Sequence, residues 1–418
     1  MLKRLKYKVY FPVAGYFGFF AKVRLRRWKP QVVIVTGSNG KTTALHMIEA
    51  RLGRAARYSH HRNSAFGICF DILGLGDASD SRWHWLLLAL LAPFRIFVSI
   101  PKEAIYVAEC DADRPGEGDF LSRLLRPEVV IWLNRARTHS ENYAEAAKER
   151  AIGIDEVIAH EFGYFLERAA QRAIINGDDA HMVERSARSK AKIEKITEAA
   201  DLGSWDVSTA GTTFVVRGKT YTLPYLLPRD VFRAIAASES VAAHFSLPPG
   251  DLASFVMPPG RSSIFRGVKN TTIIDSSYNI NAGSFAAILA MVGHMDGEKW
   301  LVLGDMTEQG AYEKEEHEKV ARMLVPGSFA RVVLVGPRMR AFALPILRGH
   351  RIRVGSFSGP KEALDYLEKN ISGAEVLVFK GARFLEGIIE HMLADPQDAK
   401  KLCRREPRWQ ERRRKWGL

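Results

Sequence analysis

The fold is decided by the stretch Val32-Val33-Ile34-Val35-Thr36-Gly37-Ser38-Asn39-Gly40-Lys41-Thr42-Thr43. A run of β-branched apolar residues predicts a buried strand, and a glycine-flanked turn follows it. The spacing of Leu45, Ile48 and Leu52 then predicts a helix that begins near Lys41. Unpaired N–H groups at the start of such a helix, together with the helix dipole, favour a bound anion. The stretch therefore predicts a phosphate-binding loop.

The residue types of this loop suit a nucleotide. Gly37 and Gly40 allow close approach of the backbone to phosphate, Lys41 can reach the terminal phosphates, and the Thr42 hydroxyl can bind Mg²⁺. Val35 stands where the longer P-loop pattern has a glycine, so the match is to the shorter form T-G-x-N-G-K-T-T. A chance Gly-Lys-Thr is the alternative, and the strand directly before it disfavours that alternative. The predicted ATP-binding residues here are Gly37, Ser38, Asn39, Gly40, Lys41, Thr42 and Thr43.

Strands and helices alternate through most of the chain, which predicts an α/β protein. We expect a P-loop central domain with a mostly parallel sheet over 31–257, with strands at 32–36, 105–109, 129–133 and 173–176. Pro258-Pro259-Gly260 marks the boundary to a Rossmann-like doubly wound domain over 258–395. Its expected strands are 271–275, 300–303, 331–335 and 375–379, and its expected helices are 283–292, 313–324, 361–369 and 384–393.

Other segments of the central part carry weaker signals. Residues 183–200 are charged and are predicted to be helical, residues 212–223 form a hairpin that turns at Arg217-Gly218-Lys219, and 228–245 form a helix. The run Trp85–Phe94 is apolar but too short to be a convincing transmembrane helix. A buried core helix or a membrane-facing insertion are the two alternatives for this run.

Charge is concentrated at the two ends of the 418-residue chain. Residues 1–30 carry nine Lys/Arg and no acid, and residues 396–418 carry nine Lys/Arg against three acids. The aromatic centre of 1–30 between basic flanks predicts an extension that binds an anionic membrane surface, although Pro12, Gly15 and Gly18 weaken a long helix. Packing on the globule is the alternative for this end, and plain solvation is the alternative for the basic tail 396–418. We expect no nucleic-acid partner.

Several further segments, in order, resemble the Mur ligases, the ATP-dependent amide ligases of cell-wall peptide assembly. They are most similar to the branch that adds D-alanyl-D-alanine to UDP-N-acetylmuramoyl-tripeptide. The resemblance covers roughly 31–393. Its motifs, besides the P-loop, are Arg62–Gly67, Ala108–Glu117, Asn134 with Thr138-His139, Ile175–Asp179, Gly260-Arg261, Ile274–Asn281, Leu303–Glu308 and Phe379–Arg383.

The resemblance implies a chemistry and a set of residues for it. Forming an amide requires a carboxylate to be activated as an acyl phosphate, with cations that offset the repulsion between ATP and the carboxylate. Lys41, Glu109 and His139 are the implied catalytic residues, and Thr42, Glu109 and His139 are the implied Mg²⁺ ligands. Glu109 as a surface acid and His139 as an ordinary loop histidine are the structural alternatives.

The same resemblance implies binding residues outside the P-loop. Arg261 and Asp275 would bind ATP, although Asp275 in Asp-Ser-Ser also fits a turn or a helix cap. The implied substrate-binding residues are Asn63, Ser64, Tyr278, Asn279, Asn281, Lys380 and Arg383.

Four departures from the family pattern qualify these expectations. Only thirty residues precede the first strand, so the UDP-binding N-terminal domain has no counterpart, and the run near 77–100 has no family equivalent. Phe162 aligns with the lysine that becomes carbamylated and binds the second Mg²⁺. The segment Leu227–Arg233 aligns with the family's adenine-binding motif but lacks the motif's His and both of its Asn residues. Asp230 is one of the residues that replace them.

We therefore expect an ATP- and Mg²⁺-dependent acid–amino acid ligase that joins a free carboxylate to an amino acid or dipeptide. It would be cytoplasmic, either free or peripheral at the inner face of the membrane. Three cysteines without metal or redox spacing suit a reducing compartment. Two alternatives remain open: a degenerate Mur-like protein that binds nucleotide without ligating, and a ligase of the poly-γ-glutamate or capsule type.

Overall fold

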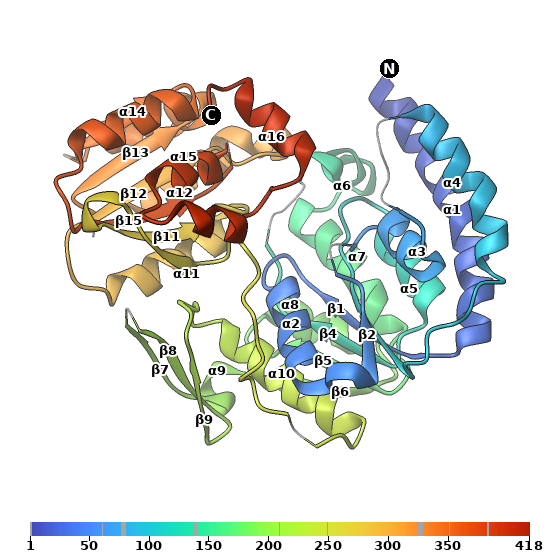
Figure 1. Cartoon of the computed structure of the whole chain (residues 1–418). Helices are drawn as coiled ribbons and strands as arrows, with labels where there is room; N and C mark the ends of the chain where they lie inside the picture. The colour runs from blue at the N-terminus through green and yellow to red at the C-terminus, as the bar shows by residue number, and fades with distance from the viewer. Residues whose placement is uncertain are drawn as a thin grey trace. The chain divides into compact units, whose positions relative to one another are not determined.

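The computed structural model describes residues 2–60, 62–76, 81–136, 140–208, 210–248, 250–324, 329–350, 352–382 and 384–418, without the side chains of 2–8, 82, 140 and 408. The chain forms two compact units (Figure 1). Unit 1 comprises 1–137, 142–201 and 232–255, and unit 2 comprises 138–141, 202–231 and 256–418.

Unit 1 is built on a six-stranded, fully parallel sheet with the order β2-β3-β1-β4-β5-β6. The apolar run of β1 is buried at its centre, because helices cover a parallel sheet on both faces. The chain runs to one side of β1 first and to the other side afterwards, so the carboxyl ends of β3, β1 and β4 are neighbours. The strands are β1 Gln31–Thr36, β2 Ala56–Tyr58, β3 Ile105–Glu109, β4 Val129–Trp132, β5 Arg172–Asn176 and β6 Lys192–Ile196.

The helices of unit 1 confirm the predicted helices near Lys41 and over 228–245. They are α1 Leu2–Trp28, α2 Lys41–Leu52, α3 Ala65–Leu73, α4 Arg82–Arg95, α5 Glu117–Leu125, α6 Ala144–Arg150, α7 Ile154–Glu167, α8 Ala180–Ser186, α9 Glu198–Asp201 and α10 Val231–His244. The prediction of a helix over 183–200 is wrong. The edge strand β6 occupies its middle, and charged residues are common on edge strands, where one side meets water.

Unit 2 contains a second six-stranded sheet with the order β10-β11-β15-β12-β13-β14. Only β10 is antiparallel to its neighbour, and β15 returns between β11 and β12. The four predicted strands are confirmed; β10 and β14, at the two edges, were missed. The strands are β10 Ser263–Arg266, β11 Thr272–Ser276, β12 Lys299–Gly304, β13 Arg331–Val335, β14 Val354–Phe357 and β15 Val376–Lys380.

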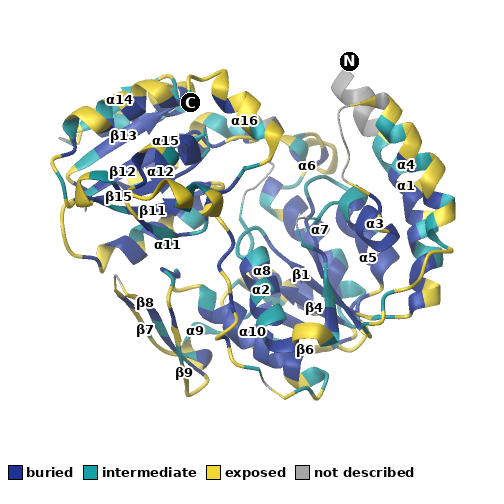
Figure 2. Cartoon of the chain, viewed as in Figure 1, coloured by how far each residue is buried: buried dark blue, intermediate teal, exposed yellow. Residues whose placement is uncertain are grey.

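Two apolar clusters, one on each face of this sheet, form the core of unit 2 (Figure 2). Phe285 and Leu301 belong to one cluster, and Trp300 and Phe379 belong to the other. The alternation of neighbours such as Trp300 and Leu301 follows from strand geometry. The helices are α11 Ala282–Gly293, α12 Glu313–Met323, α13 Leu344–Arg348, α14 Pro360–Asn370, α15 Leu385–Met392 and α16 Pro407–Arg414.

A small antiparallel sheet of β7 (Leu202–Ser208), β8 (Gly211–Val216) and β9 (Lys219–Leu223) also belongs to unit 2. The predicted hairpin over 212–223 is confirmed, and β7 adds a strand that the sequence did not indicate. The division at 257/258 into two domains remains a prediction.

The N-terminal end is helical and packed, as the packing alternative for residues 1–30 predicts, and the expected weakening by Pro12 and the glycines does not interrupt the helix. α1 is a continuous helix, and its residues Ala14, Phe17, Ala21 and Leu25 are buried at helical spacing. Gly18 is required within it because a Cβ there would lie 2.9 Å from the ring of Phe120.

The basic tail is folded onto unit 2. Arg404 lies 3.2 Å from the buried Glu386, and Arg405 lies 2.7 Å from Glu390. Simple solvation is therefore the wrong description of these arginines. In the described part of the chain, no helix has the length and hydropathy needed to cross a bilayer.

Candidate active site

The predicted phosphate loop lies between β1 and α2, at the carboxyl edge of the unit 1 sheet (Figure 1). Gly37 has φ of 131° and Gly40 has φ of 77°, both in the region that favours glycine. A Cβ on Gly37 would lie 2.9 Å from the carbonyl oxygen of Asn134, whereas one on Gly40 would meet only the Leu133 side chain at 3.8 Å. The first glycine is thus required by close packing, and the second leaves room above the helix start.

Asn134, which follows β4, holds this loop in shape. Its side-chain oxygen accepts a hydrogen bond from the Asn39 N–H at 2.8 Å, and its amide nitrogen donates to the Asn39 carbonyl at 2.8 Å. Its own carbonyl accepts from the Ser38 N–H at 3.2 Å. The Ser38 hydroxyl is bonded in turn to the backbone of Ala136 at 2.8–2.9 Å. Ser38 and Asn39 therefore shape the loop through their backbone and short side chains.

Lys41 is folded back into the loop. Its ammonium group donates to the Gly37 carbonyl at 2.6 Å and pairs with the Asp111 carboxylate at 2.7 Å, and both side chains are less than a tenth exposed. Burial acts to lower the pKa of Lys41, but the carboxylates of Asp111 and Glu109 outweigh it and raise that pKa. Lys41 is therefore a cation whose counter-ion is Asp111, and a phosphate group of a bound nucleotide could take the place of that carboxylate.

Glu109, the last residue of β3, lies beside β1 in the sheet and pairs in register with Val35. It is 7% exposed, and its N–H donates to the Ser59 hydroxyl at 2.9 Å. Thr42 is half-buried in the first turn of α2, and Thr43 is buried. His139 lies outside the described residues, so the set of Thr42, Glu109 and His139 is not tested as a set.

A buried carboxylate connects the loops around this site. Glu117 is fully buried, and its oxygens accept hydrogen bonds from the Ala65 N–H at 2.8 Å and from the Tyr10 hydroxyl of α1 at 2.7 Å. Burial raises the pKa of Glu117, and these donors together with Arg114 oppose that rise. No role for Glu117 was predicted from the sequence, although it lies in the motif that begins at Ala108.

The predicted substrate residues of the 62–67 loop have structural uses here. Ser64 caps α3, and its hydroxyl accepts from the Gly67 N–H at 3.2 Å. The Asn63 carbonyl accepts from the Asp111 N–H at 2.9 Å, so this loop is adjacent to the partner of Lys41.

Phe162 of α7 is 1% exposed and stacks on Trp132 with ring centroids 5.9 Å apart. It is a core residue, which agrees with the expectation that it cannot be a metal ligand. Its neighbour Glu161 is fully buried and accepts from the Gly116 N–H at 2.9 Å, while its other oxygen, Oε1, has no hydrogen-bond partner among the described residues. Burial raises the pKa of Glu161 to about 7.

In unit 2, four of the predicted binding residues lie near the carboxyl ends of β11 and β15. They are Arg261, Asp275, Tyr278 and Lys380. Ser276 and Lys380 are paired in register, and the Lys380 ammonium lies 3.4 Å from the Ser276 hydroxyl. Burial and the positive charge of Arg261 lower the pKa of Lys380 to about 7, which Asp275 opposes. The Arg261 guanidinium lies over the Tyr278 ring at 4.5 Å.

Asp275 combines a turn role with a buried, unsatisfied oxygen. Its Oδ1 accepts from the Ser277 N–H at 2.9 Å, as the turn alternative predicted, while its Oδ2 has no hydrogen-bond partner among the described residues. Burial raises the pKa of Asp275. A buried polar atom without a partner suits a site that binds a cation or a donor group.

The other predicted residues of unit 2 differ in what they do. Asn281 caps α11 in a capping box with Ser284, and Asn279 is exposed. Arg383 lies outside the described residues. The sequence missed Arg404 of the tail, which donates to the carbonyls of Ser277 and Tyr278 at 3.3 and 2.7 Å.

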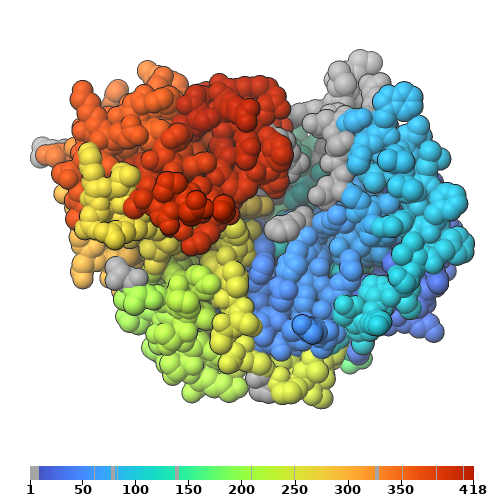
Figure 3. All heavy atoms as spheres, in the orientation of Figure 1, coloured from blue at the N-terminus to red at the C-terminus, as the bar shows by residue number. Residues whose placement is uncertain are grey.

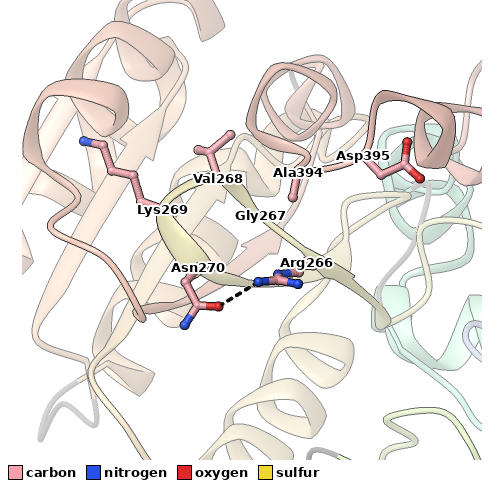
Figure 4. A pocket seen from close by; sticks show the side chains of 7 residues that line it. All are labelled: Arg266, Gly267, Val268, Lys269, Asn270, Ala394 and Asp395. Carbon is pink, nitrogen blue, oxygen red and sulfur yellow. Dashed lines mark hydrogen bonds between the residues drawn. The ribbon is translucent and has the colours of Figure 1, made fainter.

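One surface depression, of about 510 Å³, lies in unit 2 and contains none of these residues. It is lined by Arg266, Gly267, Val268, Lys269, Asn270, Ala394 and Asp395 (Figure 4). The Lys269 ammonium is used there by the carbonyls of Glu368 and Ile371 at 2.9–3.0 Å. This depression therefore offers little to a ligand.

The parallel sheet with a glycine turn, a buried lysine and a strand-end acid defines a P-loop nucleotide-binding protein. Residues 35–228 match the Mur ligase middle domain, and residues 260–383 match the Mur ligase, glutamate ligase domain. The chain belongs to the Mur ligase family. It is an ATP-dependent carbon–nitrogen ligase, of a class that works in cell-wall peptide synthesis.

Relatives and solved structures agree with this assignment. The chain is 27% identical to UDP-N-acetylmuramoyl-tripeptide–D-alanyl-D-alanine ligase of Bacillus subtilis over 401 residues, covering 90% of this chain and 79% of the relative. It is 26% identical to the Escherichia coli protein of the same name, over 75% and 66% of the two chains. The fold matches MurF ligase from Thermotoga maritima in complex with ADP at a TM-score of 0.71 and 22% identity, covering 90% of this chain and 82% of that one.

Proposed function

We propose that this ligase joins the carboxylate of a cell-wall precursor to an amino acid or dipeptide, with D-alanyl-D-alanine as the first donor to test. The pairing of buried Lys41 with Asp111 beneath a glycine turn carries this proposal. The names of the Bacillus subtilis and Escherichia coli relatives support the choice of donor and acceptor.

In this reaction a carboxylate oxygen of the acceptor attacks the γ-phosphorus of ATP, and ADP leaves. The donor amine then attacks the acyl carbon, the carbon–oxygen bond breaks, and phosphate leaves as the amine loses a proton. Lys41 would stabilise the charge on the transferred phosphoryl group. Arg261 and Lys380 are cations that suit a nucleotide phosphate or a substrate carboxylate.

Mg²⁺ fits the residues at the carboxyl ends of β1 and β3. The Thr42 hydroxyl and the Glu109 carboxylate are oxygen ligands of the kind that Mg²⁺ prefers, and both stand next to the phosphate loop. When bound, the metal would neutralise phosphate charge. His139 remains a predicted ligand.

Phosphate release from ATP by the purified protein tests the proposal. We expect release that requires Mg²⁺, a carboxylate acceptor such as the UDP-linked muramoyl tripeptide, and D-alanyl-D-alanine together, with an equal amount of amide product. Nucleotide binding without product for any acceptor and donor would contradict it.

A nucleotide-binding protein without ligase activity is the second candidate. Phe162 in the core and Asp230 in place of an adenine-binding asparagine favour it, because each removes a group that the family uses. A ligase of the poly-γ-glutamate or capsule type is the third, and it would use glutamate as donor in the same phosphate assay.

We also propose that the protein works in the cytoplasm, peripherally at an anionic membrane. The nine basic residues and the absence of acids in 1–30 support this location.

A further inference from the structure

The outward side of α4 and the residues after it form an exposed apolar surface. Figure 2 shows the exposed side of α4, and Figure 3 shows the atoms of this part of the chain, in cyan, at the surface of the molecule. The members of the apolar surface are large, and several are more than half exposed, among them Trp83 at 80%, Leu90 at 60%, Phe94 at 68% and Phe97 at 76%. We call this set the α4 face: Trp83, Leu86, Leu87, Leu90, Leu91, Phe94, Phe97, Val98 and Ile100. A contiguous apolar patch of this kind on a soluble domain marks an interaction site.

The helix that carries this face is firmly docked on its other side. Leu88 and Ala92 are buried, and the Trp85 ring contacts that of Phe66 with centroids 5.1 Å apart. These contacts seat α4 on α1 and α3, so the apolar residues that remain exposed are oriented by a folded support.

Polar contacts to α1 fix α4 as well. The Tyr16 hydroxyl donates to the Ala89 carbonyl at 2.8 Å, and the buried Arg24 donates to the Ser99 carbonyl at 2.8 Å. Figure 1 shows the two helices side by side. The pair therefore forms one surface element, and its apolar and basic residues act together.

The charged residues of α1 and of 81–100, the segment that carries the α4 face, are all basic. Arg26 and Arg27 at the end of α1 and the following Lys29 are exposed. Phe19 of α1 is also 63% exposed. Apolar side chains beside these cations are complementary to the interface of an anionic bilayer.

We propose that the α4 face inserts into the headgroup region of an anionic bilayer, while α1 beneath it supplies the cations. This changes the role of α1, because its buried aromatic residues are used for packing and the inserting residues come from α4. The inference goes beyond the ligase reaction, which does not require it.

The test is sedimentation of the full chain with vesicles of phosphatidylglycerol and phosphatidylcholine. We expect binding that falls with salt and with the removal of phosphatidylglycerol. The double variant Leu87→Glu/Leu90→Glu should lose binding by about tenfold or more, because two charges would enter the interface. Val256→Glu changes an exposed apolar residue of unit 2 and is the matched control.

The outcomes separate this inference from the proposed function and from dimerisation. Vesicle binding equal in parent, double variant and control would overturn it, provided that ATP affinity shows the variants to be folded. A concentration-dependent dimer that the double variant abolishes, without vesicle binding, would also overturn it. Vesicle binding with no ligase activity would contradict only the ligase proposal.

A second, independent observation concerns a group of metal-ligating side chains. His46 and Glu49 of α2 and His60 after β2 place one ligand atom each within 4.8 Å of one another. Oε2 of Glu49 lies 3.7 Å from His46 Nδ1 and 3.0 Å from His60 Nε2. A tetrahedral ion with bonds of about 2.0–2.1 Å holds its ligand atoms at about 3.3 Å, which these separations bracket.

We infer that His46, Glu49 and His60 form a site for a divalent transition ion such as Zn²⁺, separate from the Mg²⁺ of the nucleotide. All three side chains are only partly buried, so a water molecule can complete the coordination. The ion would connect α2, the helix that follows the phosphate loop, to the chain after β2.

Titration with Co²⁺ in the absence of nucleotide tests this site. We expect the intense visible absorption of a tetrahedral Co²⁺ site in the parent, at least a tenfold weaker affinity in His60→Ala and Glu49→Gln, and no change in His181→Ala, an exposed histidine of unit 1. Equal Co²⁺ affinity and spectra in all four proteins would overturn the inference.

Discussion

Asp111 matters at the scale of single residues because it is the counter-ion of Lys41 at 2.7 Å. Asp111→Asn leaves a buried lysine cation without its carboxylate, which costs about 3–5 kcal/mol. We predict a lower melting temperature without nucleotide and a larger rise on adding ATP, because phosphate replaces the missing charge. Differential scanning calorimetry with and without ATP measures both effects, and a variant that melts like the parent would contradict the role of Asp111.

Glu161 predicts a pH dependence of stability. Burial raises the pKa of its carboxyl group to about 7 from the ordinary value of 4.5, so the folded protein binds more protons than the unfolded chain between these two pH values. Stability from this group is full below about pH 4.5 and is lost as the pH rises toward 7. The cost at higher pH is at most about 3 kcal/mol, since one pKa unit corresponds to 1.36 kcal/mol.

Glu161→Gln removes this titration, so its free energy of unfolding should fall less than that of the parent between pH 5 and pH 8. Urea denaturation at these two pH values measures the difference. Glu149→Gln, which changes an exposed glutamate of the same unit, is a suitable control. Identical pH dependence in the parent and Glu161→Gln would refute the prediction.

Phe162 predicts activity that does not depend on bicarbonate. It is buried against Trp132, so this position has no lysine to take up CO₂. Ligase activity in CO₂-depleted buffer should be unchanged when bicarbonate is added. A rise would show that another lysine, such as the exposed Lys148, has that role.

The sequence predicted residues that belong to a local pattern and missed residues that act through space. Lys41 and Gly37 follow from their motif, whereas Asp111 reaches Lys41 from a different strand end, and Arg404 reaches Tyr278 across 126 positions of the chain. Two carboxylates in Glu109-Cys110-Asp111 after a buried strand were the only available signal for Asp111.

At the scale of elements, the loop between β1 and α2 depends on β4 through Asn134. Asn134→Ala removes two hydrogen bonds of 2.8 Å to the backbone of Asn39. We predict a weaker ATP affinity, by about thirtyfold, because each lost bond contributes about 1 kcal/mol to holding the loop. Isothermal titration with ATP and Mg²⁺ measures it, and parent-like affinity would show that the loop keeps its shape unaided.

Elements with a clear period were predictable, and elements at an edge were not. The buried strands β1, β11 and β13 follow from β-branched runs, while the edge strand β6 has the charged sequence Lys-Ile-Glu-Lys-Ile. α4 was predicted as either buried or membrane-facing, and its exposed side shows that the buried alternative is wrong. Periodicity places apolar residues on a face, but it does not say whether protein covers that face.

At the scale of the whole molecule, the two basic ends differ in whether their basic side chains are paired with acids or exposed. Arg404 and Arg405 of the C-terminal end form ion pairs with Glu386 and Glu390. At the N-terminal end, Arg26 and Arg27 of α1 and the following Lys29 are exposed beside the α4 face. Two ends with the same number of basic residues therefore need not have the same function. Which charges remain available depends on the acids that the fold brings near them.

The central claim is that Lys41 and its loop form the ATP site of a ligase, and ATP affinity of Lys41→Ala tests it most directly. The matched control is Lys190→Ala, an exposed lysine of the same unit. Isothermal titration with Mg²⁺ and ATP should give parent-like affinity in Lys190→Ala and a loss of at least about a hundredfold in a folded Lys41→Ala, since a buried charged contact is worth roughly 3 kcal/mol or more. Unchanged ATP affinity in a folded Lys41→Ala protein would contradict the account.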